Sequence, residues 1–376
     1  MFARYLQIRK CEKEGYVIPM NYSVDKKTAT AVLEEQCEPL FDGPVDATLA
    51  HKSGEMVITE GKEGQVLDTA ATLKAIRTFL NEDWNGEDGI VSVQYQVTKP
   101  DIQAKDLEEV QDLLGSYETS FYPTGSSAQN IEAGAKHING SIVMPGTEFS
   151  ANEAMEPYTE EEGYTESGSY ANGEVVQTMG GGICQVSTTL YNALLLAELE
   201  ITERMPHSMM IDYVDPSMDA AIADDIKDLK FKNNYDTAVY LECIVGTGTL
   251  KVNIYGKETR PSNRTVEFES EILATDEEEG VRYVATDNYV GYYEVISAAR
   301  KGVSAQLWKI VYEDGKEVSR DVINTSYYTS AKKTIGVGTA TSDEALKNKV
   351  LAAISTQDEE TILNAIYGGG DSDSEE

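Results

Sequence analysis

Apolar side chains recur at two spacings in the N-terminal part of the chain, and each spacing predicts a different element. Residues 69–81 repeat them every three to four positions behind Asp68, which is typical of an amphipathic helix with an aspartate N-cap. Residues 90–97 alternate apolar and polar side chains, as a half-buried strand does. We therefore predict one α+β module over residues 15–110, with further elements at 16–20, 28–37, 45–49 and 56–59.

The middle of the chain carries two stretches of helical periodicity. Leu107, Val110 and Leu113 lie at helical spacing within residues 101–116, where we expect a connecting helix. A second apolar stripe runs along residues 186–198 and predicts a buried helix. The side chains of this stripe are Val186, Leu190, Ala193, Leu194 and Ala197.

The pattern changes to alternation in the C-terminal third. Residues 292–296 and 308–312 alternate as strands do, and the Asp-Gly pair within residues 313–316 predicts a hairpin turn. We therefore predict a mostly β module over residues 262–340.

The last residues are strongly acidic. From residue 343 on, nine acids accompany two bases. A short helix with Leu346, Val350 and Leu351 is possible there, and three glycines at 368–370 precede the last four acids. Such a segment buries too little apolar surface to offset the entropy of ordering, so we expect residues 341–376 to be a largely disordered tail. The chain as a whole is predicted to be α+β, with three modules in series of which the last is mostly β, at 15–110, 117–258 and 262–340.

The net charge of −34 excludes two classes of partner. Binding to the phosphates of nucleic acids, or to anionic lipid, requires a positive surface. No run of apolar residues approaches the length that spans a bilayer, about 18 residues. The first ten residues also lack the apolar core of a signal peptide.

Three consecutive glycines, Gly180, Gly181 and Gly182, lead directly into the predicted helix at 186–198. Glycine adopts backbone angles closed to other residues and lets a ligand or a second backbone approach closely. Cys184 then lies in the first turn of that helix. Free N–H groups and the helix dipole lower the pKa of a thiol there and can hold an oxyanion.

His207 and two acids, Asp219 and Asp228, follow Cys184 along the chain. The order Cys, His, Asp suits a nucleophile, its base and an orienting acid, and it resembles that of transglutaminase-like and papain-like enzymes. The two aspartates are rivals for the last role. Cys184 has three interpretations at this point: a nucleophile, part of a non-catalytic binding site, or a structural residue. A zinc site of Cys184, His207 and an aspartate is a further alternative, and no cofactor is expected.

Polar and small residues around this motif are candidates for ligand contacts. Gln185 suits either an oxyanion donor or a cap of the turn, and the hydroxyl groups after it suit a cap of the helix. The expected ligand-binding residues are Gly180, Gly181, Gly182, Gln185, Ser187, Thr188 and Arg204.

The central segment, 117–258, resembles the VanW family. The stretches that carry the resemblance stand in the family's order and spacing: Asn130-Ile131, Ile138-Asn139-Gly140, Pro145-Gly146, Gly163-Tyr164, residues 180–193, Glu203-Arg204, His207-Ser208, Tyr213-Val214, residues 228–233 and Ile254-Tyr255-Gly256. No reaction is established for this family, so the resemblance implies the domain and its compartment. The family is named for an accessory gene of vancomycin-resistance clusters.

The flanking segments resemble two modules of the bacterial surface. The turn Glu60-Gly61-x-x-Gly64-x-x-Leu67-Asp68 is similar to that of a peptidoglycan-binding module found beside VanW domains. Residues 315–320 together with Val337-Gly338-Thr339 resemble the G-five (G5) domain.

These resemblances imply a cell-envelope protein outside the cytoplasm that associates with peptidoglycan or another wall polymer. Its VanW-like domain is expected to bind wall peptides or glycans, with a link to glycopeptide (vancomycin) resistance. The alternative is a cysteine-dependent acyl-transfer or hydrolytic enzyme that acts on wall peptides. An export signal or a membrane anchor is expected outside this chain.

Overall fold

The computed structural model describes residues 2–15, 22–171, 174–223, 226–277 and 279–368. The chain divides into two compact units, one of residues 1–50 and 57–108 and one of residues 51–56 and 109–376. Within the described residues, no helix is both long enough and apolar enough to cross a membrane.

The first unit is built around a capped helix. Asp68 Oδ1 accepts the backbone N–H of Ala71 (2.8 Å) and begins α3, which confirms the predicted cap. Leu73 on the same helix is buried. The elements up to residue 108 are α1 (Phe2–Glu14), α2 (Lys26–Cys37), η1 (Glu38–Leu40), β1 (Thr48–Lys52), β2 (Glu55–Thr59), β3 (Gly64–Leu67), α3 (Thr69–Thr78), η2 (Phe79–Asp83), β4 (Tyr95–Thr98) and α4 (Ala104–Leu107), of which β1 and β2 lie partly in the second unit.

One expected strand of this unit starts later than predicted, and another cannot be compared. The strand predicted at 90–97 begins only at Tyr95, because Gln94 bonds to the start of α3 instead of a neighbouring strand. Its N–H donates to Thr72 Oγ1 (2.9 Å) and its carbonyl accepts the N–H of Asp68 (2.9 Å). The strand predicted at 16–20 lies outside the described residues.

The connecting helix predicted at 101–116 is wrong. Only α4 is helical there, and β5 (Asp112–Ser120) follows as a strand that pairs with β13 (Thr249–Gly256). Gly115 explains the strand, since a Cβ at this position would lie 2.4 Å from the carbonyl oxygen of Ala193. The backbone of β5 thus packs directly against the helix that carries the cysteine.

The central part of the second unit has helices packed on a four-stranded sheet ordered β5-β13-β12-β6. α7 (Cys184–Leu196) contacts β5 and β13, and α5 (Ser126–Ile138) contacts β12 (Val239–Val245). α7 matches the predicted helix, and Cys184 is its first residue. The remaining elements are β6 (Ile142–Val143), β7 (Glu148–Ser150), α6 (Ala151–Met155), β8 (Glu166–Ala171), β9 (Glu174–Met179), β10 (Glu200–Arg204) and β11 (Leu229–Lys232).

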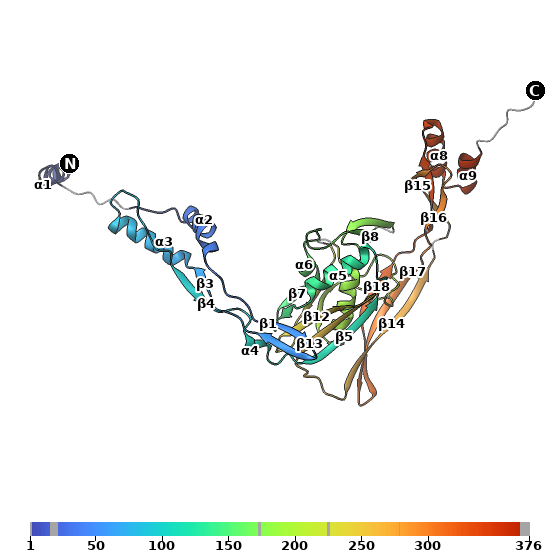
Figure 1. Cartoon of the computed structure of the whole chain (residues 1–376), viewed down its shortest axis with the longest axis horizontal. Helices are drawn as coiled ribbons and strands as arrows, with labels where there is room; N and C mark the ends of the chain where they lie inside the picture. Colours follow the sequence, from blue (N-terminus) through green and yellow to red (C-terminus); the bar gives the residue numbers. More distant parts are fainter. Residues whose placement is uncertain (1, 16–21, 172–173, 224–225, 278, 369–376) are drawn as a thin grey trace, which may run out of the picture. The chain divides into compact units, whose positions relative to one another are not determined.

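The C-terminal module is mostly β, as predicted. Three long strands, β14 (Arg264–Asp276), β17 (Gly302–Glu313) and β18 (Lys316–Tyr328), form one antiparallel sheet (Figure 1). The predicted hairpin is confirmed: Asp314 and Gly315 have φ of 49° and 72° and join β17 to β18. A second sheet holds β15 (Val281–Tyr289), β19 (Lys333–Ala340) and β16 (Tyr293–Ser297).

The prediction of a largely disordered tail over 341–376 does not hold for most of that segment. α8 (Glu344–Thr356) and α9 (Glu359–Tyr367) follow β19, and α8 packs on β15 and β19. Val350 and Ile362 are fully buried against Tyr283 and Val337 of the sheet. The burial of five apolar residues of the two helices therefore outweighs the acidic composition of the segment. Residues 369–376 lie outside the described part.

Candidate active site

The glycine turn sets the position of Cys184. Gly180 and Gly182 have φ of 76° and 106°, a region that other residues rarely adopt. A Cβ on Gly181 would lie 2.4 Å from the carbonyl oxygen of Ser167, so this backbone approach also requires glycine. Asn130 Nδ2 donates to the carbonyl of Gly181 (2.9 Å) and holds the turn in place. Cys184 then begins α7.

Cys184 is half-buried, and its side chain packs against the central core. In its neutral form the thiol donates to the carbonyl oxygen of Ile222 (3.4 Å). It is also a hydrogen-bond partner of His207. The sulfur is thus held between the helix start and the segment that carries the histidine and its acid.

His207 is buried and lies between Cys184 and Asp219. Its Nδ1 donates to Asp219 Oδ2 (2.7 Å), and its backbone N–H donates to the same oxygen (2.7 Å). Because Nδ1 is engaged, Nε2 is the ring nitrogen available to Cys184. Lys227 Nζ donates to the carbonyl of Pro206 (2.8 Å) and steadies the backbone just before the histidine.

Asp219 is fully buried, and its carboxylate is completely satisfied. Oδ1 accepts Arg204 Nη2 (2.8 Å) and the hydroxyl of Tyr328 (2.5 Å), while Oδ2 accepts the two donors of His207. Arg204 Nε also donates to the carbonyl of Asp219 (2.6 Å). The acid is therefore fixed in both position and orientation.

The electrostatics of the three side chains favour their charged forms. Burial alone would raise the pKa of the Cys184 thiol, but the hydrogen bond and charge of His207 bring it below its usual value of 9.0. Burial likewise opposes the charged form of His207, yet Asp219 and Cys184 raise its pKa to about 9. For Asp219, His207 and Arg204 outweigh burial and lower the pKa to about 2. These directions describe a thiolate beside an imidazolium.

Of the two rival acids, the structure brings only Asp219 to the histidine. Asp228 instead accepts the hydroxyl of Ser150 (2.6 Å) and the backbone N–H groups of Asn152 (3.0 Å) and Leu229 (2.7 Å). It therefore secures the corner between β7 and α6. These contacts favour Asp219 over Asp228 as the orienting acid.

Four side chains expected to contact a ligand are turned into the protein instead. Gln185 Nε2 donates to Thr119 Oγ1 and to the carbonyl of Ser120, both at 2.9 Å. Ser187 and Thr188 are fully buried, and their hydroxyl groups donate to the carbonyl of Ala220 (2.7 and 3.2 Å). With Arg204, which binds Asp219, these residues tie α7 to the segment around residue 220, so their role is positioning.

Metal ligation finds no support in the arrangement of the side chains. Within the part of the chain that the structure describes, no three His, Cys, Asp or Glu side chains are grouped as metal ligands. Asp219 Oδ2, the oxygen nearest the histidine, is taken by two donors of His207. All four cysteines are free, including Cys11 and Cys37.

Sequence reasoning missed one contact of the site, because it comes from the C-terminal module. Tyr328 is the second residue of the tyrosine pair that ends β18, and nothing in its local pattern indicates a partner more than a hundred residues away. Only the tertiary structure places it on Asp219.

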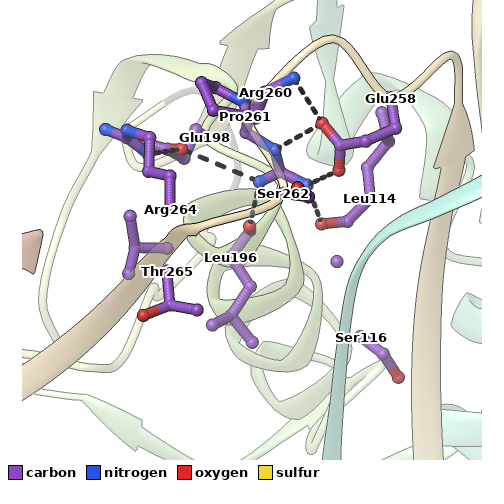
Figure 2. Close-up of a pocket in the computed structure, with 12 residues that line it drawn as sticks. Leu114, Ser116, Leu196, Glu198, Glu258, Arg260, Pro261, Ser262, Arg264 and Thr265 are labelled. Atoms are coloured by element: carbon purple, nitrogen blue, oxygen red, sulfur yellow. Dashed lines mark hydrogen bonds and ion pairs between the residues drawn. The ribbon is translucent and has the colours of Figure 1, made fainter. Parts of the chain in front are cut away.

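A pocket of about 430 Å³ lies at the opposite end of α7 and has a different character (Figure 2). Arg260 donates to the carbonyl oxygens of Leu196 and Leu114 (both 2.8 Å) and pairs with Glu258. Arg264 pairs with Glu198 in the same place. These charged side chains pair with one another, and in doing so they connect α7, β5 and the start of β14 around the pocket.

Comparisons with known proteins match three parts of the chain. The family described as "VanW like protein" matches residues 126–255, "Putative peptidoglycan binding domain" matches residues 1–88, and "G5 domain" matches residues 271–340. These matches confirm the three resemblances seen in the sequence. The domains together are those of a cell-wall-associated protein.

Two curated proteins are similar to this chain. It is 26% identical to "Uncharacterized protein YoaR" of Bacillus subtilis (strain 168), over 67% of this chain and 82% of that protein. It is 30% identical to "Vancomycin B-type resistance protein VanW" of Enterococcus faecalis (strain ATCC 700802 / V583), over 28% of this chain and 41% of that protein.

Two solved structures of G5 domains are also similar. The IgA1 protease G5 domain is 20% identical, with a TM-score of 0.14, and the match covers 21% of this chain and 94% of that domain. The HP0197 G5 domain is 17% identical, with a TM-score of 0.12, and the match covers 20% and 95%. The family matches and the curated relatives together identify a VanW-like domain that is followed by a G5 domain in this chain.

Proposed function

We propose that the VanW-like domain is a cysteine-dependent acyl-transfer or hydrolytic enzyme that acts on peptides of the bacterial wall. One observation carries the proposal: Cys184, His207 and Asp219 form a connected set in which the histidine bridges the thiol and the acid. This is the arrangement of a nucleophile, a general base and an orienting acid. The domains on either side, matched as a peptidoglycan-binding domain and a G5 domain, support wall peptides as the substrate.

The chemistry follows from the charges of the set. The Cys184 thiolate attacks the carbonyl carbon of an amide, and the carbonyl π electrons move to its oxygen. When the tetrahedral intermediate collapses, the carbon–nitrogen bond breaks and the His207 imidazolium gives its proton to the leaving amine. A thioester on Cys184 results. Water or a second amine then attacks it, loses a proton to His207 and releases the thiolate.

The other residues support these steps without touching the reacting atoms. Asp219 holds Nδ1 of His207, which keeps Nε2 directed at the sulfur and stabilises the imidazolium. The backbone N–H groups of Gln185 and Val186 donate to the carbonyl oxygens of Gly182 and Ile183 (3.0 and 2.8 Å), so these two groups are not free to hold a developing oxyanion. The side chain of Gln185 supplies no oxyanion donor either, since both of its amide hydrogens are engaged by Thr119 and Ser120 at the end of β5.

We also propose that the wall polymer is bound by the N-terminal module and the G5 domain, outside the cytoplasm. The matched family descriptions support this assignment. The similarity to a vancomycin resistance protein supports a link to glycopeptide resistance. That link predicts that a strain lacking the gene changes in glycopeptide susceptibility, and that Cys184→Ala fails to restore it.

Incubation of the full chain with purified peptidoglycan tests the enzyme and the binding protein against each other. We expect wild-type protein and Cys184→Ala to sediment equally with insoluble peptidoglycan. Only the wild type should change the peptide fragments or cross-links that are released from it by muramidase. If both proteins sediment and neither changes the fragments, the domain is a wall-binding module and the enzyme proposal is wrong.

A further inference from the structure

The buried carboxylate of Asp219 has a donor that belongs to the G5 domain. The hydroxyl of Tyr328 donates to Asp219 Oδ1 (2.5 Å) and accepts the backbone N–H of Ser217 (2.7 Å). Tyr328 and Ser217 are both buried, with 1% and 0% of their surface exposed. A single hydroxyl group therefore links the last residue of β18 to the acid and to the backbone two residues before it.

Two further residues of β18 reach the same region. Ser326 Oγ accepts Arg204 Nη1 (2.9 Å), the guanidinium that also holds Asp219. Asn324 Nδ2 donates to the hydroxyl of Tyr191 (2.7 Å) and to the carbonyl of Ser217 (3.2 Å). Residues 324, 326 and 328 alternate along the strand, so one face of β18 is turned toward the cysteine domain.

Several anchors hold this face in place. Leu307 and Phe268 of the G5 sheet pack into the core cluster that contains α7. Glu198, just beyond the end of α7, pairs with Arg264 on β14 and with Lys309 on β17, as the junction in Figure 2 shows for Arg264. The VanW-like and G5 domains thus share apolar contacts in the core and charged contacts beyond the C-terminal end of α7.

We propose that the G5 domain is a built-in part of the catalytic centre, in which Tyr328 and Ser326 are positioning residues for Asp219 and Arg204. This inference rests on the proposed function and extends it: the wall-associated β module also orients the acid of the triad. The neighbouring Tyr327 provides a matched control, because it lies on the opposite face of β18 and is 60% exposed.

The direction of the effect separates positioning from simple electrostatics. Tyr328→Phe removes one donor from the carboxylate, which by itself makes Asp219 more basic, raises the pKa of His207 and favours the thiolate. The same change leaves the buried N–H of Ser217 without its acceptor and frees the segment that carries Asp219. Positioning therefore predicts the opposite outcome, a histidine that no longer faces Cys184 and a less reactive thiol.

The rate of Cys184 alkylation by iodoacetamide, measured on the full chain from pH 5 to 9, tests this inference. For Tyr328→Phe we expect the rate at pH 6.5 to fall about tenfold and the midpoint of the profile to rise by about one pH unit, the order expected when a hydrogen bond to a charged group is lost. Ser326→Ala should shift the profile in the same direction by less. Tyr327→Phe should leave it unchanged.

A stability control excludes a general loss of folding. Val337→Ala removes buried volume from the other G5 sheet, away from the contact face, so it should lower the melting temperature without moving the profile. If the wild-type thiol is reactive but Tyr328→Phe leaves the pH profile unshifted or moves it to lower pH, the positioning role alone is wrong. The same holds if Val337→Ala moves the profile as much as Tyr328→Phe does. A wild-type Cys184 that is unreactive at pH 6.5 overturns the triad and this inference together.

Discussion

Replacing His207 by alanine should convert Cys184 from a reactive thiol into an inert one. The imidazolium is the main group that counteracts the effect of burial on the sulfur. Without it, burial acts unopposed, as it does at Cys243, where burial and the nearby Glu242 raise the thiol pKa to about 12. The loss of this one side chain should therefore raise the pKa of the Cys184 thiol.

The size of this effect follows from the histidine itself. Its pKa rises from 6.5 to about 9 through its contacts with Asp219 and Cys184. At about 1.4 kcal/mol for each pH unit, the two partners together favour the imidazolium by about 3 kcal/mol. If the thiolate contributes the smaller part, the fraction of thiolate at pH 6.5 should fall by up to about tenfold in His207→Ala.

Labelling with iodoacetamide followed by peptide mass spectrometry measures this directly. Cys243 serves as an internal reference for an unreactive buried thiol, and His137→Ala is the matched control, since His137 pairs with Glu162 and stacks on Tyr164. We expect His137→Ala to label Cys184 as the wild type does. Equal labelling of Cys184 in His207→Ala and the wild type would refute the ion pair.

Three further predictions concern stability. Gly181→Ala should destabilise the glycine turn and abolish rapid labelling of Cys184, because the new Cβ would lie 2.4 Å from the carbonyl oxygen of Ser167. At Gly43 a Cβ meets nothing within 4 Å, so Gly43→Ala should change neither the stability nor the labelling. A histidine whose pKa is raised on folding stabilises the protein fully below pH 6.5. The unfolding free energy of the wild type relative to His207→Gln should therefore fall by about 3 kcal/mol as the pH rises through 9. A difference that stays constant with pH would contradict this. Ile362→Ala should cost about 2–5 kcal/mol by thermal or denaturant unfolding, and no loss would mean that α9 does not pack as described.

Periodicity predicted the helices that use local caps and stripes. α3 behind Asp68 and α7 behind the glycine turn are both where their patterns indicate, and Cys184 begins the second of them. The helix expected at 101–116 failed because the spacing of Leu107, Val110 and Leu113 says nothing about Gly115. That glycine is needed for a strand backbone to pack on α7.

The candidate site was only partly predictable for the same reason. Chain order placed His207 and two aspartates after Cys184, but only tertiary contacts distinguish Asp219, which binds the histidine, from Asp228, which secures a corner of the fold. The hydroxyl groups of Ser187 and Thr188 looked available for a ligand because nothing local reveals that the carbonyl of Ala220 takes them. Residues far apart in sequence met through β pairing and core packing.

Trapping of an acyl-enzyme tests the central claim most directly. Full-length protein is mixed with soluble stem peptides from the wall, quenched in acid and measured by intact mass and peptide mapping. The account predicts an adduct of acyl mass on Cys184 of the wild type, removed by hydroxylamine as thioesters are, slower to appear in Asp219→Asn and absent from Cys184→Ala. Peptides that bind the wild type and leave its mass unchanged at every time point would contradict a nucleophilic Cys184.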